Sequence, residues 1–198
     1  MTSTQEPQTG ATRRKRADAE RNLNALLESA KAVFASSGVD APAKQITDAA
    51  GLGVGTLYRH FPRRADLIVA VLHHEIDACA RAATTLRREH TPYAALQEWV
   101  LQYVDLVGTK RGLAEALQSD DDAFAGLHDY VAEQLEPAVA DLLTAAVEAR
   151  EVNQRLDAAE LLCALSLLCQ PVPSDRFDAD YNRRMVSIFI EALRRTPA

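Results

Sequence analysis

Residues 49–67 read AAGLGVGTLYRHFPRRADL, and this stretch decides how the fold is interpreted. It combines three glycines and a proline with the run Tyr58-Arg59-His60 and two further arginines. Each interior glycine costs a helix about 1 kcal/mol relative to alanine, which disfavours one continuous helix here. Apolar residues nevertheless recur at helical spacing on both sides of the stretch. The pattern predicts two short helices joined by a glycine turn.

The two short helices are predicted over residues 43–50 and about 54–60, with Gly51 between them. Glycine supplies the left-handed backbone that a tight turn between helices requires. An amphipathic stretch with leucines at intervals of three and four residues precedes them and ends at Gly38. After Pro62, which suits the first turn of a helix, a long apolar stripe begins. Two short helices packed on an amphipathic helix form a helix-turn-helix.

The charge of the chain is divided unevenly along its length. For the whole chain, a net charge of −6 and a pI near 5.4 argue against a nucleic-acid partner. Residues 1–65 nevertheless carry ten basic and six acidic residues, a net charge of +4. The remaining 133 residues carry twelve basic and 22 acidic residues, a net charge of −10. A basic end attached to an acidic body indicates that this end meets a polyanion.

The rest of the chain is also predicted to be helical, so the fold class is all-α. Apolar stripes at helical spacing run through residues 96–107, 124–147, 158–169 and 181–193, without β alternation or an internal repeat. Pro137 is expected to kink or split the second of these helices. The acidic run Asp120–Asp122 is interpreted as the cap of that helix, not as a metal site, because a helix N-terminus favours negative charge.

The string AGLGVGTLYRHFPRRADL resembles the DNA-binding signature of the TetR family of transcriptional regulators, and the resemblance extends from about Arg21 to Ile76. It implies a homodimer in which an N-terminal three-helix helix-turn-helix domain precedes a larger C-terminal helical domain for ligand binding and dimerisation. We therefore expect three parts in the chain. These are a disordered basic arm over residues 1–16, a DNA-binding domain over 17–77 with the helix-turn-helix proper at about 43–61, and the C-terminal domain over 78–198.

The DNA contacts are carried over from the family by position. The resemblance implies that the start of the second short helix faces the major groove, while tyrosine, histidine and lysine side chains contact phosphates. Tyrosine and histidine donate well to phosphate, and arginine reaches either phosphate or guanine. The residues expected to bind DNA are Lys44, Thr47, Val54, Gly55, Thr56, Tyr58, Arg59, His60 and Arg64.

The sequence departs from the family pattern at Pro42-Ala43 and at Val54, and it has an arginine in place of the usual lysine at position 64. Pro42-Ala43 stands where the family often has a serine or threonine that caps the helix and touches phosphate. Val54 replaces a frequent polar residue, which predicts either apolar contact with a thymine methyl or no base reading. Arg64 stands where the family usually places a lysine that grips phosphate. For Tyr58 and His60, packing inside the small domain is the alternative interpretation.

The C-terminal region, from Tyr93 onward, resembles only the generic regulatory domain of the family. The informative residues for an effector pocket carry polar atoms among apolar neighbours, although each of them could instead belong to the core or the surface. His73 and Asp77 are four residues apart but lack a third ligand, so neither a metal nor another cofactor is expected. The candidate pocket residues are His73, Cys79, Trp99, Tyr103, Phe124, His128 and Tyr130.

The last two predicted helices are apolar enough to pair with their copies in a second subunit as a four-helix bundle. A dimer also suits DNA reading, because successive major grooves on one face of a duplex lie about 34–36 Å apart. The alternative is that the same residues form an internal core. The residues expected in the dimer interface are Leu161, Leu165, Leu168, Tyr181, Met185, Ile188 and Phe189.

The predicted function is that of a homodimeric repressor. It would bind a palindromic double-stranded operator and be released by a small-molecule effector. No apolar run reaches the roughly 18 residues that span a bilayer, so no membrane partner is expected and the protein is placed in the cytoplasm. The cysteines, Cys79, Cys163 and Cys169, lack CxxC spacing and are interpreted as small buried residues. The alternative that Cys163 and Cys169 form a redox-active pair stays open.

Two other function classes compete with the regulator. A helical-bundle enzyme would need Glu-x-x-His pairs on facing helices, and the sequence near His73 and His128 lacks that spacing. No enzyme activity is therefore expected. The other alternative, a helical adaptor protein whose basic N-terminal part binds an acidic protein, is not excluded by the sequence. Steep salt dependence and a preference for a palindrome would distinguish the regulator from the adaptor.

Overall fold

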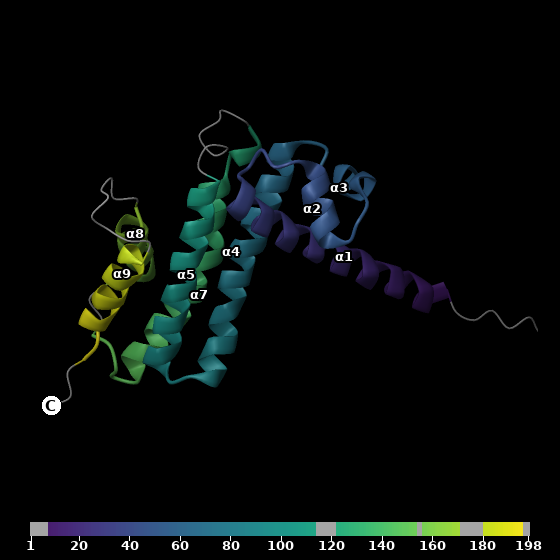
Figure 1. Ribbon diagram of the computed structural model, residues 1–198. Coiled ribbons are helices and arrows are strands. Elements are labelled where there is room, and N and C mark those ends of the chain that lie inside the picture. Colours follow the sequence, from purple (N-terminus) through teal and green to yellow (C-terminus); the bar gives the residue numbers. More distant parts are fainter. Residues whose placement is uncertain (1–7, 114–121, 154–155, 171–179, 196–198) are drawn as a thin grey trace, which may run out of the picture. The chain divides into compact units, whose positions relative to one another are not determined.

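In the computed structural model, the described residues are 8–113, 122–153, 156–170 and 180–195 (Figure 1). All regular elements in these ranges are helices, which confirms the predicted all-α class, and Val152 pairs with Arg194 in an isolated bridge. Within the same ranges, no helix combines the length and apolar character needed to cross a membrane. The elements are α1 (Gln8–Ser37), α2 (Ala43–Ala50), α3 (Val54–His60), α4 (Arg64–Glu89), α5 (Pro92–Gly112), η1 (Asp122–Phe124), α7 (Leu127–Glu148), α8 (Ala158–Leu168) and α9 (Tyr181–Ala192).

The chain separates into two compact units, residues 1–71 and residues 72–198. The division falls inside α4, which begins in the first unit and continues into the second. The predicted domain boundary after residue 77 stays a prediction. α1 begins at Gln8, inside the stretch that we expected to be a disordered arm. Residues 8–16 include arginine, lysine and alanine, which favour helices.

The first unit is held by the apolar faces of its helices. α2 packs against α1 and α3, and Leu26, Ile46 and Leu67 are almost completely buried. α2 ends at Ala50, and the following Gly51 has a φ of 66°, which lies in the left-handed region. The N–H of Gly51 donates to the carbonyl oxygen of Asp48 at 3.2 Å. The predicted turn is therefore present, and its backbone conformation favours glycine.

The second unit is built around α5. This helix packs against α7, α8 and α9, while α8 also packs against both α7 and α9. In Figure 1, α5 and α7 run side by side. Leu96, Trp99 and Val100 of α5 have no exposed surface. α5 is therefore the central helix of this unit, and the other helices bury its apolar side chains.

α7 differs from the sequence-based expectation at its start and at its proline. It begins at Leu127, and the preceding Gly126 has a φ of 79°, which interrupts a helix. The acidic run therefore does not cap α7: Asp122 belongs to η1, and Asp120 and Asp121 lie outside the described residues. Pro137 does not split α7, which continues to Glu148.

Candidate nucleic-acid interface and regulatory domain

α3 presents two large apolar side chains outward. Val54 is 37% exposed and Tyr58 is 54% exposed, and their spacing of four residues places them on one helix face. Arg59 and His60 are also exposed, and Thr56 is half-buried. Leu57, in contrast, is buried and anchors the helix in the domain. Four of the predicted DNA-binding side chains are therefore available on the surface of one short helix.

The start of α3 carries no side chain at Gly53 or Gly55, although the described residues leave room for one at both positions. Neither Gly53 nor Gly55 has a positive φ. A Cβ atom built at either position would meet no other atom within 4 Å. Gly51 differs, because its left-handed backbone conformation favours a glycine. The missing side chains at Gly53 and Gly55 leave this end of α3 open to the close approach of another surface.

Arg64 is engaged inside the first unit. Its Nε donates to the carbonyl oxygen of Val39 at 2.7 Å, and its Nη2 donates to the same oxygen and to that of Ala41 at 2.7 Å. Its guanidinium also lies 4.7 Å from the centroid of the Phe34 ring. Burial lowers the pKa of Arg64, and the nearby Asp40 carboxylate opposes this shift. Arg64 therefore ties α4 to the segment between α1 and α2, and its expected phosphate contact stays a prediction.

The two DNA-binding candidates on α2, Thr47 and Lys44, differ in their exposure to solvent. Thr47 has no exposed surface, and its Oγ1 donates to the carbonyl oxygen of Lys44 at 3.1 Å. Thr47 is therefore part of the core, and its side chain is not accessible to DNA. Lys44 is exposed and pairs with Asp48 at 2.6 Å. An exposed pair of this kind is worth about 0–1 kcal/mol, so a phosphate can compete for the lysine.

Three of the predicted pocket residues form a closed core cluster in the second unit. Trp99 Nε1 donates to the carbonyl oxygen of Cys79 at 2.8 Å, and the Trp99 and Tyr103 rings stack with centroids 5.9 Å apart. The Tyr103 hydroxyl lies 2.6 Å from Ser166 Oγ. Burial raises the pKa of the Cys79 thiol to about 12. All three side chains are buried in the core of the second unit, which is the alternative position expected for them.

The other four pocket candidates do not join that cluster. The His73 and Tyr130 rings stack with centroids 4.0 Å apart, and the Tyr130 hydroxyl donates to Asp77 Oδ1 at 2.6 Å. Phe124 is half-buried in η1, and His128 is exposed on α7. Among the described residues, the seven candidates thus occur as a buried cluster, a stacked pair and two separate side chains, and their place in an effector pocket stays a prediction.

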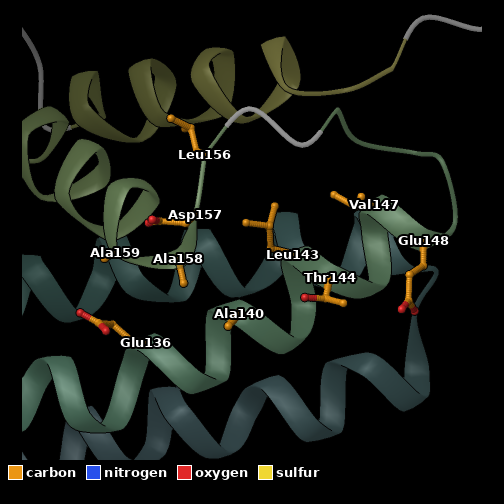
Figure 2. A pocket seen from close by; sticks show the side chains of 10 residues that line it. All are labelled: Glu136, Ala140, Leu143, Thr144, Val147, Glu148, Leu156, Asp157, Ala158 and Ala159. Atoms are coloured by element: carbon orange, nitrogen blue, oxygen red, sulfur yellow. The ribbon is translucent and has the colours of Figure 1, made fainter.

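A groove lies elsewhere, between α7 and the start of α8 (Figure 2). Its volume is about 610 Å³, and none of the seven candidates lines it. Sequence reasoning missed it because most of its residues are small or ordinary helix residues, and searching for aromatic and histidine side chains could not find it. The lining residues are Glu136, Ala140, Leu143, Thr144, Val147, Glu148, Leu156, Asp157, Ala158 and Ala159.

The residues expected in a dimer interface divide into buried and exposed groups. Leu161 and Leu165 have no exposed surface and belong to the core of the unit. Ile188 on α9 is 63% exposed, and Leu167 on α8, which sequence reasoning missed, is 68% exposed. Half-buried between these extremes are Leu168, Tyr181, Met185 and Phe189. The expectation of buried cysteines is confirmed for Cys79 and Cys169 but is wrong for Cys163, which is exposed on α8.

Two short helices, α2 and α3, joined by the glycine turn at Gly51, define a helix-turn-helix protein, and the second of them exposes Tyr58, Arg59 and His60. Two family models match the chain. "Bacterial regulatory proteins, tetR family" matches residues 26–71, and "Transcriptional regulator SbtR-like, C-terminal domain" matches residues 91–195. The chain belongs to the TetR family of bacterial transcriptional regulators.

Individual proteins show the same relationship. The HTH-type transcriptional regulator SAR0097 of Staphylococcus aureus (strain MRSA252) is 31% identical over 100 residues, which are 48% of this chain and 52% of the relative. The chain thus spans about half the length of the curated relatives it matches. The TetR transcriptional regulator SCO0520 from Streptomyces coelicolor is 28% identical, with a TM-score of 0.74 over 88% of this chain and 99% of the other. The TetR transcription regulatory protein from Mycobacterium vanbaalenii is 31% identical, with a TM-score of 0.69 over 91% of this chain and 99% of the other.

Proposed function

We propose that this chain is a homodimeric repressor in the cytoplasm that binds a palindromic DNA operator and leaves it when a small-molecule effector binds. The observation that carries the proposal is the surface of α3, where Val54, Tyr58, Arg59 and His60 are exposed around the buried anchor Leu57. Family membership supports the same function.

The exposed groups divide into base contacts and phosphate contacts. Arg59 and Thr56 offer hydrogen-bond donors to base edges in the major groove, and Val54 offers an apolar surface that suits a thymine methyl. Tyr58, His60 and Lys44 donate to phosphates, which position the helix without reading sequence. This division assigns the sequence preference to the start of α3.

The dimer is proposed to form through the outer faces of α8 and α9. Leu167 and Ile188 are large apolar side chains that a second copy would remove from water. A two-fold axis there would pair each helix with its own copy, as in a four-helix bundle. Two copies of α3 would then serve two half-sites of a palindrome.

The effector is proposed to act by differential affinity. A ligand that binds the DNA-free arrangement of the dimer more tightly than the DNA-bound arrangement shifts the population towards the former. By linkage, the operator must then weaken ligand binding by the same factor. Both affinities are measurable on the purified protein.

Selection of DNA from a random double-stranded pool tests the function. We expect enrichment of an inverted repeat and an affinity that falls steeply with salt. Arg59→Ala should weaken binding to the selected site about fivefold to 150-fold, the range for one good base contact. Arg88→Ala removes the same charge from an exposed position in the other unit and should leave binding nearly unchanged. Equal binding to all sequences, or none, would contradict the proposal and favour the adaptor.

A further inference from the structure

The groove between α7 and the start of α8 is lined by one stripe of α7. Ala140, Leu143 and Val147 recur at intervals of three and four residues, so they lie along the same helix face. Leu156 and the alanines at the start of α8 form the opposite wall. Because alanine side chains are short, α8 leaves space above the stripe. The volume of about 610 Å³ falls within the usual range for small-molecule sites.

The polar groups of this groove are acidic. Glu136, Glu148 and Asp157 line it, and no lysine, arginine or histidine is among the lining residues. Figure 2 shows Glu136 and Asp157 at one end of the groove and Glu148 at the other end. Leu143 lies in the middle, between these two ends. An anion would therefore meet like charges, whereas a cation would meet opposite ones.

The carboxylates of Glu136 and Asp157 differ in whether they already accept a hydrogen bond inside the chain. One oxygen of Asp157 accepts the backbone N–H of Glu160 at 2.8 Å and so caps α8. Within the described part of the chain, Glu136 is half-buried and has no hydrogen-bond or ion-pair partner. The Glu136 carboxylate is therefore available to pair with a cation that enters the groove.

We infer that this groove binds an organic cation with an elongated apolar body. The cationic head lies between Glu136 and Asp157, and the apolar body covers Ala140, Leu143 and Val147 beneath Leu156. Such a ligand would contact α8, the helix that also carries Leu167. Its action as the effector of DNA release rests on the proposed function, but its binding does not.

Calorimetric titration of the full chain tests the site with three probes, each used below its micelle concentration and while the circular dichroism stays native. Decyltrimethylammonium carries both the charge and the apolar body. We expect tetramethylammonium, which lacks the body, and decanoate, which has the opposite charge, each to bind at least about tenfold more weakly. Equal binding of the cation and decanoate would overturn the inference.

Variants then locate the site. Glu136→Gln should weaken binding of decyltrimethylammonium about threefold to fivefold, the effect of one partly exposed charge pair. Asp141→Asn removes the same charge from an exposed α7 residue outside the groove and should change affinity less than about twofold. Ala140→Leu places bulk in the path of the apolar body and should also weaken binding while the chain stays folded. Unchanged affinity in both Glu136→Gln and Ala140→Leu would place the probe elsewhere and overturn the site.

The effector role has a separate readout. On DNA selected as described above, decyltrimethylammonium should release the wild-type chain, and Glu136→Gln should require about threefold to fivefold more probe. Binding without release would refute the effector role and leave the binding site standing. Failure of the chain to select any DNA would refute the proposed function without affecting the calorimetric result.

Discussion

The Nε of Arg64 donates to the carbonyl oxygen of Val39 at 2.7 Å and so joins residues 25 positions apart in the sequence. The same guanidinium reaches Ala41 and lies over the Phe34 ring. A lysine has neither the planar fork nor the several donors that make these contacts at once. Arg64 therefore fixes the start of α4 against the segment that connects α1 to α2.

We expect Arg64→Ala to lower the free energy of unfolding by about 1.5–3 kcal/mol, because hydrogen bonds from a charged donor to part-buried carbonyls are lost. Denaturant titration measures this change. Arg63 is the matched control: it is an exposed neighbour that pairs with Asp66 at 2.7 Å, so Arg63→Ala should cost about 1 kcal/mol or less. Equal destabilisation by the two variants would show that the carbonyl contacts of Arg64 contribute little.

Tyr130 gives a prediction about pH. Its hydroxyl donates to the Asp77 carboxylate, and this hydrogen bond together with burial raises the pKa of Tyr130 to about 12. Because the folded pKa lies above the ordinary value of 10.0, the neutral phenol stabilises the fold. That stabilisation is complete below about pH 10 and is lost as the pH rises through about 12.

Tyrosinate absorbance tests this coupling. The difference between the wild-type chain and Tyr130→Phe should titrate with a midpoint near 12. Asp77→Asn keeps an acceptor oxygen but removes the charge, so it should move that midpoint towards the ordinary value. A difference signal that already titrates at the ordinary value in the wild-type chain would contradict the hydrogen bond.

The outer faces of α8 and α9 give a prediction about assembly, which rests on the proposed dimer. Replacing the exposed Leu167 and Ile188 together by aspartate should convert dimers to monomers in sedimentation equilibrium while the chain stays folded. Leu165→Ala is the contrasting variant: it opens a cavity in the core and should lower stability by about 2–5 kcal/mol. An L167D/I188D variant that stays dimeric would move the interface to another face.

Sequence reasoning was reliable where the deciding interactions are local. Gly51 adopts the predicted left-handed turn because only its own backbone and its neighbours determine that conformation. Periodicity also identified the apolar faces of α8 and α9. It could not say whether Leu161 and Leu165 face their own core or a second subunit, because both surroundings select the same residue types. The folded chain encloses both leucines.

Long-range partners explain the remaining differences. Thr47 and Arg64 look like surface residues in sequence, yet the first is fully buried and the second reaches carbonyl groups more than 20 positions away. The groove beside α7 depends on how α8 lies across a stripe of ordinary residues. No spacing rule within one helix encodes that arrangement, so it emerges only from the folded unit.

Gly55 provides a test in which stability and function should change in opposite directions. Its φ is not positive, and a Cβ atom there would meet nothing within 4 Å, so Gly55→Ala removes no favourable contact of the fold. Alanine also reduces the freedom of the unfolded chain and favours helix, which should stabilise the protein by up to about 1 kcal/mol. The new methyl group would stand on the bare start of α3 that we propose to enter the major groove. Binding to the selected DNA should therefore weaken, by about tenfold or more if the helix is held off by one methyl.

Thermal unfolding and fluorescence anisotropy on the same preparation measure the two effects of Gly55→Ala. Gly51→Ala is the control, because its left-handed φ of 66° should make that variant less stable by about 1 kcal/mol or more. Loss of DNA binding in Gly51→Ala would thus come with loss of stability, whereas Gly55→Ala should lose binding while its melting temperature rises. A Gly55→Ala chain that is more stable and binds DNA as tightly as the wild type would show that no surface approaches α3 at this point, because an added methyl group cannot be accommodated at a close contact without cost.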